Sequence, residues 1–168
     1  MRIAVIGAHC VGKTTIVEEL QKLLSDYEFY SEPYYELEER GYLFPETPTI
    51  DDYIEQFEYS IRQISASGDN AVFDRCFVDL LAYIQAVSKS EDIQAFYQKV
   101  EDVLSEIDLF IFVPIEEPDR IPCSELPELR QEVNEILYDL IRDLGIEAIE
   151  VSGNISQRLN QIKSKTTK

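Results

Sequence analysis

The sequence predicts an α/β fold, with a five-stranded parallel sheet that has helices on both faces. Segments with the apolar runs of buried strands alternate with segments of helical periodicity from end to end, a pattern typical of parallel sheets covered by helices. The first strand leads directly into a glycine-rich loop and a helix, an order that suits phosphate binding. The chain shows no internal repeat, linker or low-complexity tract. Residues 1–168 are therefore expected to form a single domain.

The first strand, over 2–6, is followed by Gly7-Ala-His-Cys-Val-Gly-Lys-Thr14. This loop matches the pattern G-x-x-x-x-G-K-[ST], in which glycines let successive backbone N–H groups turn toward a bound phosphate. Lys13 would add a positive charge, Thr14 a hydroxyl ligand for Mg²⁺, and Thr15 a contact to the α-phosphate. Apolar residues at one face of the next segment predict a helix. A strand, this loop and a helix together indicate a nucleoside triphosphate site.

The later elements follow from the same patterns. In chain order they are a strand over 27–32, an irregular stretch over 33–48 with a helical turn near 36–40, a helix that Thr49 caps and that ends near 67, a strand over 71–74, helices near 77–88 and 91–105, a strand over 108–113, a proline-rich loop over 114–127, a helix over 129–144, a strand over 146–151 and a helix over 154–162. The loop over 114–127 has no periodicity and is expected to be mobile.

Charge and composition disfavour several classes of function. The chain has 15 basic and 33 acidic residues and a formal charge of −18. This balance argues against a nucleic-acid partner, because polyanion binding draws on clustered lysines and arginines. No segment has the length of a membrane span, and the N-terminal apolar run is too short for a signal peptide.

The three cysteines, Cys10, Cys76 and Cys123, form an odd count without metal-ligand spacing. A cytoplasmic protein with reduced thiols is therefore expected. Cys10 lies inside the glycine-rich loop and could be sensitive to oxidation, although a small loop filler is the favoured interpretation.

Asp74 and Arg75 end the third predicted strand. A carboxylate at the end of a strand beside a phosphate loop can hold Mg²⁺ through water. Arg75 would then point at phosphate or at the phosphoryl acceptor. The alternative is a structural ion pair, but the neighbouring loop favours the functional interpretation.

Further charged groups are expected at the same edge of the sheet. Glu32 ends the second strand, and strands of open parallel sheets deliver their C-terminal ends to the ligand crevice. There Glu32 could orient an acceptor hydroxyl and take its proton. Arg120, in the proline-rich loop, and Arg130, in the next helix, could neutralise charge on the transferring group if this loop closes as a lid. The alternatives are an exposed acid for Glu32 and a solvated helix face for Arg130.

These motifs resemble those of P-loop kinases of the nucleoside and nucleotide kinase group. The nearest resemblance is to the AAA-type subgroup that includes bacterial nicotinamide riboside kinases, followed by deoxynucleoside kinases. It extends over nearly the whole chain and rests on the loop at 7–14, Ser31-Glu32-Pro33, and Phe73-Asp74-Arg75 with the downstream Asp79-Leu-Leu-Ala-Tyr83. Asp119-Arg120 with Arg130-Gln-Glu-Val133 is similar to a degraded form of the family's lid.

The resemblance implies a three-layer P-loop kinase fold with a short lid after the fourth strand, and ATP and Mg²⁺ as cofactors. It implies a metal contact for Asp74, a substrate contact for Arg75 and the role of base for Glu32. His9, the single histidine, is expected to be a loop filler rather than a catalytic base. The predicted catalytic residues are Lys13, Glu32, Asp74, Arg75, Arg120 and Arg130, and the predicted metal contacts are Thr14 and Asp74. The predicted nucleotide contacts are Gly7, Ala8, His9, Cys10, Val11, Gly12, Lys13, Thr14, Thr15, Gly153 and Asn154.

The region expected to cover the acceptor is acidic and aromatic. Residues 26–59 hold 11 acidic residues, a single basic residue, Arg40, and 10 of the 18 aromatic residues. A monophosphate acceptor needs arginines, whereas aromatic faces and carboxylates attract neutral or cationic rings. The pattern favours a nucleoside-like acceptor over a nucleotide. The expected partner is this small molecule, and a homodimer is left open.

Three functions remain open at this stage: a small-molecule kinase, an ATPase or nucleotide-dependent switch, and a module that binds nucleotide without turnover. The Asn-Lys-x-Asp and Thr-Lys-x-Asp motifs for guanine are absent from the sequence. The chain is also too short for a ring-forming motor with its lid domain, and its acidity disfavours a polynucleotide kinase. The kinase is the leading hypothesis.

Overall fold

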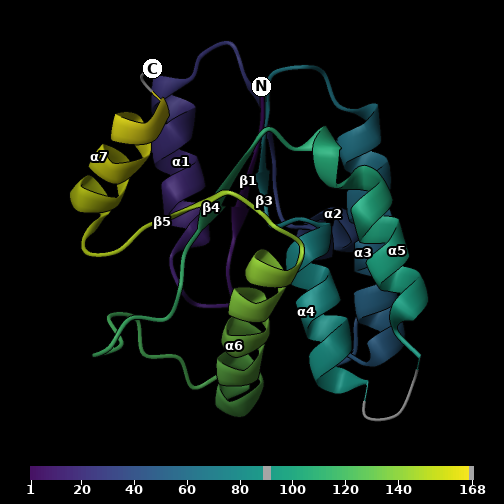
Figure 1. Ribbon diagram of the computed structural model, residues 1–168. Helices are drawn as coiled ribbons and strands as arrows, with labels where there is room; N and C mark the ends of the chain where they lie inside the picture. Colours follow the sequence, from purple (N-terminus) through teal and green to yellow (C-terminus); the bar gives the residue numbers. More distant parts are fainter. Residues whose placement is uncertain (89–91, 167–168) are drawn as a thin grey trace.

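A five-stranded parallel sheet forms the centre of the molecule, with helices on both of its faces (Figure 1). It is seen in a computed structural model that describes residues 1–88 and 92–166. The strand order is β2-β3-β1-β4-β5. The strands are β1 (Arg2–Ile6), β2 (Glu28–Tyr30), β3 (Ala71–Asp74), β4 (Leu109–Phe112) and β5 (Ala148–Glu150). The predicted fold class is therefore confirmed.

The helices form the two outer layers of the fold. They are α1 (Lys13–Leu23), α2 (Pro33–Glu39), α3 (Ile50–Ala66), α4 (Phe77–Val87), α5 (Gln94–Val103), the short 3₁₀ helix η1 (Leu104–Glu106), α6 (Pro127–Asp143) and α7 (Ile155–Thr166). In Figure 1, α1 and α7 lie on one side of the sheet, and α3, α4, α5 and α6 lie on the other. None of the described helices has the length and apolar character needed to cross a membrane.

The central strands are apolar because helices cover both faces of the sheet. Residues 3–6 of β1 are at most 2% exposed, and every residue of β3 is buried. Such continuous apolar runs are typical of parallel strands in α/β folds. The polar groups of the site consequently lie at the strand ends or beyond them, with Asp74 as the last residue of β3.

Strand register aligns the segments that carry the predicted site. Val5 of β1 pairs with Asp74 of β3, and Tyr30 of β2 pairs with Phe73. The loop that starts at Gly7 therefore leaves the sheet beside Asp74, and Glu32 lies beside Arg75. β1 is flanked by β3 and β4, so the chain connections diverge on either side of it, which is where open α/β sheets bind ligands.

Two helices begin at prolines that the sequence analysis assigned to irregular structure. The expected irregular stretch after 33 is wrong for its first part, because α2 begins at Pro33. Likewise α6 begins at Pro127, two residues before its predicted start. Proline suits the first helical turn, because its φ is already fixed there and its missing N–H has no partner to lose. For the helix predicted over 91–105, residue 91 lies outside the described residues.

Candidate active site

The phosphate loop, residues 7–14, joins the end of β1 to α1. A side chain at Gly7 would place its Cβ 2.4 Å from the carbonyl oxygen of Val113, so only glycine fits there. Gly12 has a φ of 91°, a conformation that L side chains rarely adopt. The two glycines of the motif are therefore required by a close approach and by a left-handed turn, respectively.

Lys13 points back into the loop. Its side chain is buried, and Nζ donates a hydrogen bond of 2.6 Å to the carbonyl oxygen of Ala8. Burial lowers the pKa of Lys13, and the nearby charge of Arg75 lowers it further. The ammonium group is thus held inside the loop, where it can contact a bound polyphosphate.

Thr14 and Asp74 meet at the mouth of the loop. Thr14 Oγ1 donates a hydrogen bond of 2.6 Å to Oδ2 of Asp74, whereas Oδ1 of Asp74 is buried and has no hydrogen-bond partner. Burial raises the pKa of Asp74, and the charge of Glu32 adds to this effect. A buried carboxylate oxygen without a partner, next to a threonine hydroxyl, fits the oxygen ligands that Mg²⁺ requires.

Glu32 and Arg75 form an ion pair beside this metal-type arrangement. Glu32 Oε2 lies 3.3 Å from Nε of Arg75, at an angle that does not make a hydrogen bond. Arg75 also lies over the ring of Tyr83, with 4.8 Å between its Cζ and the ring centroid. Burial raises the pKa of Glu32, but the charges of Arg75 and Lys13 outweigh it and hold the net pKa below its usual value. Glu32 is consequently ionised at neutral pH.

A cleft of about 600 Å³ opens beside these four side chains. Aromatic and acidic residues make up much of its lining, and Arg75 is the one arginine among its described lining residues. Its lining residues are His9, Cys10, Thr14, Glu32, Tyr34, Tyr35, Glu38, Pro48, Tyr53, Gln56, Arg75, Tyr83, Glu125 and Leu126. The structure therefore brings Thr14, Glu32 and Arg75 together at one cleft, with Asp74 bonded to Thr14.

A second cleft, of about 230 Å³, also borders the phosphate loop, at Gly12. It is lined by Gly12, Thr15, Arg120, Ile121, Gly153, Asn154, Ile155 and Arg158. The predicted contacts Thr15, Gly153 and Asn154 meet here. Arg120 is also here, paired with Glu116. It lines this cleft, whereas Glu32 and Arg75 line the larger one.

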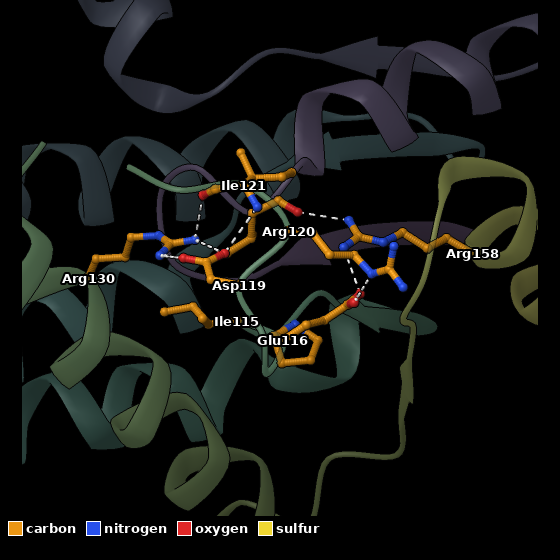
Figure 2. Close-up of a pocket in the computed structure, with 9 residues that line it drawn as sticks. Ile115, Glu116, Asp119, Arg120, Ile121, Arg130 and Arg158 are labelled. Carbon is orange, nitrogen blue, oxygen red and sulfur yellow. Dashed lines mark hydrogen bonds and ion pairs between the residues drawn. The ribbon is translucent and has the colours of Figure 1, made fainter. Parts of the chain in front are cut away.

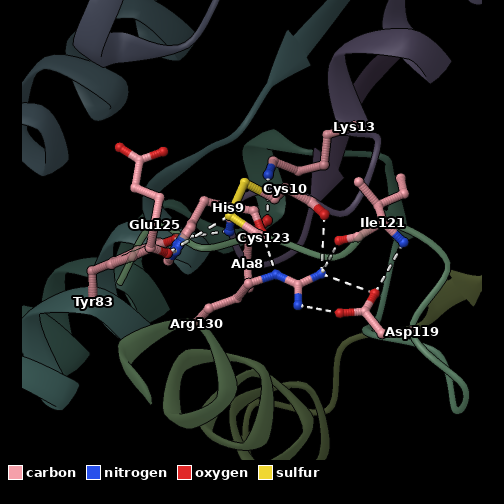
Figure 3. Close-up of a disulfide and its surroundings, with 10 residues drawn as sticks. All are labelled: Ala8, His9, Cys10, Lys13, Tyr83, Asp119, Ile121, Cys123, Glu125 and Arg130. Carbon is pink, nitrogen blue, oxygen red and sulfur yellow. Dashed lines mark hydrogen bonds and ion pairs between the residues drawn. A yellow bond between two sulfur atoms is a disulfide. The ribbon is translucent and has the colours of Figure 1, made fainter. Parts of the chain in front are cut away.

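Arg130 clamps the phosphate loop from one side. Its guanidinium donates to the carbonyl oxygens of His9 and Cys10 at 2.9 and 3.0 Å, and forms an ion pair of 2.6 Å with Asp119. Its side chain is 7% exposed, so the alternative of a solvated helix face is wrong. Arg130 thus links α6 to the lid segment, residues 114–126, as Figure 2 shows, and to the phosphate loop, as Figure 3 shows.

Arg158, which the sequence analysis did not single out, clamps the loop from α7. It donates to the carbonyl oxygens of Val11 and Gly153 at 2.8 and 3.0 Å and pairs with Glu116. Figure 2 shows it across the lid segment from Arg130. The sequence did contain a signal, because position 158 falls on the same helix face as the apolar Ile155 and Ile162. An arginine within an apolar face indicates a buried charge with partners.

His9 connects the loop to α4 and to the lid segment. The hydroxyl of Tyr83 accepts from the backbone N–H of His9 and lies 2.8 Å from Nδ1, while Nε2 lies 2.7 Å from the carbonyl oxygen of Glu125. Burial lowers the pKa of His9, and the carbonyl of Glu125 opposes this effect. Both ring nitrogens are engaged, which suits a bridging role in the loop.

The expectation of three reduced thiols is wrong for two of them. Cys10 in the phosphate loop and Cys123 in the lid segment form a disulfide with a Cα–Cα distance of 6.0 Å (Figure 3). Cys76 is buried and free. The 113 residues between the paired cysteines conceal their proximity in the sequence, since it depends on the lid segment folding back over the loop.

Fold and site together define a P-loop protein. The sequence profile of the AAA domain family matches residues 2–158, and the chain belongs to this family. None of the curated protein sequences compared with the chain matches it.

Solved structures of nucleoside and nucleotide kinases share the fold. The NadR protein in complex with NR superposes with a TM-score of 0.77 at 18% identity, over 99% of this chain and 51% of NadR. The chain thus spans about half the length of that protein. Deoxyadenosine kinase from M. mycoides gives a TM-score of 0.70 at 17% identity over 100% of both chains. Thymidylate kinase from Candida albicans gives 0.68 at 17% identity, over 98% of this chain and 89% of the kinase. The predicted resemblance is confirmed.

Proposed function

We propose that the protein transfers the γ-phosphoryl group of ATP, with Mg²⁺, to a hydroxyl of a nucleoside-like small molecule. The observation that carries the proposal is the placement of the Glu32–Arg75 pair beside the Thr14–Asp74 pair at one cleft. A carboxylate that could act as base and oxygen atoms that could bind a metal therefore lie beside the phosphate loop. Phosphoryl transfer needs this combination of positioning and charge neutralisation.

The residues of the loop would hold the donor. Lys13 and the backbone N–H groups of 7–14 would bind the phosphates of ATP. The adenine ring would lie in the cleft of about 230 Å³, beside Gly153 and Asn154. Thr14 and Asp74 would hold Mg²⁺, which when bound supplies charge neutralisation at the phosphates. This assignment uses the unpartnered Oδ1 of Asp74.

Glu32 and Arg75 would act on the acceptor side. Glu32 is ionised and can accept the proton of an acceptor hydroxyl, while Arg75 stays charged and can hold the group that receives or carries phosphate. Their mutual ion pair keeps both side chains in place before the acceptor arrives. Arg130 would contribute by fixing the phosphate loop through its hydrogen bond to His9. Arg120 would contribute a positive charge in the smaller cleft, on the side of ATP.

The charge of the larger cleft favours a nucleoside over a nucleotide. Glu32, Glu38 and Glu125 line it, against Arg75 as the one arginine among the described lining residues. Arg40 lies over the ring of Tyr59, and Arg62 pairs with Glu55, and neither lines the cleft. The phosphate of a nucleoside monophosphate acceptor would therefore meet acidic groups that repel it.

The test is acceptor-dependent release of ADP. Purified protein with ATP and Mg²⁺ is given nucleosides, nucleoside monophosphates, sugars and vitamins one at a time, and ADP is measured for each. The expected result is release with a nucleoside-like compound and little without an acceptor. Acceptor-independent release would instead establish an ATPase, and tight ATP binding without any release would establish a binding module. Release with monophosphates but with no nucleoside would overturn the acceptor class.

A further inference from the structure

The phosphate loop and the lid segment are joined covalently as well as by hydrogen bonds. Cys10 and Cys123 are both half-buried, so small molecules can reach them, whereas Cys76 is fully buried. Burial raises the pKa of the Cys76 thiol, which makes it unreactive by comparison. The pair therefore offers a selective site for thiol chemistry between the phosphate loop and the lid segment.

A metal is a weaker interpretation of the same cluster. Cys10, Cys123 and Glu125 present ligand atoms within 4.8 Å of one another. Structural zinc sites have four ligands, and the nearby His9 already has both ring nitrogens engaged by Tyr83 and Glu125. The Cα–Cα distance of 6.0 Å, in contrast, lies in the range of protein disulfides.

The disulfide differs in kind from the other contacts of the lid segment. Arg130 pairs with Asp119 and donates to the carbonyl oxygen of Ile121, and His9 contacts Glu125. These contacts can break and re-form when a lid opens for nucleotide exchange. A covalent bond between Cys10 and Cys123 cannot, so it holds the segment against the loop (Figure 3).

We propose that Cys10 and Cys123 form a reversible thiol–disulfide switch that locks the lid segment onto the phosphate loop and slows nucleotide exchange. The oxidant is a low-molecular-weight disulfide. One protein thiolate attacks it and releases one thiol, and the second protein thiolate then displaces the other thiol. Two protein thiols are oxidised to one disulfide, and one disulfide is reduced to two small thiols, which take up the two protons. Excess dithiol reverses the exchange. The effect on catalysis rests on the proposed function, whereas the effect on nucleotide exchange does not.

The experiment compares the full chain after treatment with glutathione disulfide and after treatment with dithiothreitol. Thiols are counted by alkylation and mass spectrometry of the denatured protein, and exchange is followed with a fluorescent ADP analogue. The expected thiol count is three after reduction and one after oxidation, as follows from three cysteines and one pair. Exchange should be at least about tenfold slower in the oxidised protein, because opening of the lid then limits it. Dithiothreitol should restore it.

Cys123→Ser provides the matched control, since Cys123 lies in the lid segment and lines neither of the two clefts. The variant cannot form the internal disulfide, although Cys10 can retain a mixed disulfide with glutathione, which the mass of the intact protein detects. The fraction of the variant without this adduct should exchange nucleotide at the rate of the reduced protein in either treatment. Three alkylatable thiols after oxidation of the wild type, equal exchange rates for its oxidised and reduced forms, or slowed exchange in adduct-free Cys123→Ser would each overturn the switch. Because these readouts need no acceptor, failure of the proposed kinase activity would show separately, as absent ADP release.

Discussion

The donor half and the acceptor half of the site are built differently. On the donor side, Lys13, Arg130 and Arg158 are buried, and each donates to carbonyl oxygens of or beside the phosphate loop. On the acceptor side, Tyr35 is 55% exposed, and the cleft is open and acidic. The backbone of the proposed donor half is therefore held by buried side-chain contacts. In the proposed acceptor half, side-chain chemistry rather than backbone geometry would select the ligand.

This difference explains why a sequence pattern identifies the donor more sharply than the acceptor. Triphosphate binding depends on backbone N–H groups, and these require glycine at the fixed positions Gly7 and Gly12. Acceptor binding depends on shape and charge in a cleft to which several elements contribute. Many residue combinations can produce such a cleft, so no short motif records it. The following predictions test the two halves separately.

The largest effect is expected from Lys13→Ala, which removes the buried charge of the donor half. Acceptor-dependent ADP release should fall at least about 10³-fold, because a preorganised charge on the phosphates is lost. Lys22→Ala is the matched control, since Lys22 lies at the exposed end of the same helix and pairs only with Glu19 among its described ion pairs. More than a tenth of the wild-type rate in Lys13→Ala would contradict a donor site at this loop.

Glu32→Gln tests the proposed base, which lies where the acceptor half borders the Thr14–Asp74 pair of the donor half. The value of kcat should fall about 10²- to 10³-fold, because general-base assistance is lost, while the KM for ATP should stay within about twofold. Glu36→Gln, four residues away on α2, is the control, since Glu36 accepts from Ser31 and Tyr59 rather than from Arg75. An equal loss in both variants would indicate a structural role for this segment instead of a base.

Much of the fold could be predicted from the sequence, because the central strands are short apolar runs and the long helices have apolar residues at helical spacing. The start of α2 at Pro33 could not be predicted, because proline is common both in the first turn of a helix and in loops, and the sequence does not distinguish the two. Of the site, the loop and the groups at the ends of the strands could be predicted, since parallel strands bring those ends together. The apolar helix face around Arg158 indicates a buried charge, but it does not identify the partner. The contact of Arg158 with Val11 and the Cys10–Cys123 pair both join segments more than 100 residues apart, and local patterns carry no record of such pairings.

Asp79 tests how firmly the donor half is anchored. Its carboxylate accepts from the backbone N–H groups of Gly7 and Cys76 at 2.6 and 2.9 Å, and burial raises its pKa to about 6. The folded state therefore holds this proton more tightly than the unfolded state, whose pKa is near 3.8. The contribution of Asp79 to the free energy of unfolding is then largest at low pH and falls by about 1 kcal/mol between pH 5 and pH 7.

Urea unfolding of wild type and Asp79→Asn across this pH range measures the effect, because the asparagine variant lacks the titrating group. The difference in free energy of unfolding between wild type and variant should shift against the wild type as pH rises. Asp102→Asn, at an exposed position of α5, is the control for an Asp-to-Asn change outside the site. A difference that is constant with pH would show that Asp79 does not titrate between pH 5 and pH 7.

The smallest effect is expected from Tyr35→Ala on the open side of the acceptor cleft. Tyr35 lines the cleft but is 55% exposed, so its ring can contribute only part of its surface to the ring of a bound nucleoside. Losing that contact should raise the KM for the acceptor by roughly three- to fivefold, the size of an exposed aromatic or cation–π contact, with the KM for ATP unchanged. Tyr138→Ala on α6 is the control, because Tyr138 is 42% exposed and lines neither cleft. A change in the KM for ATP, with none for the acceptor, would place Tyr35 in the donor half and break the division between the two sides.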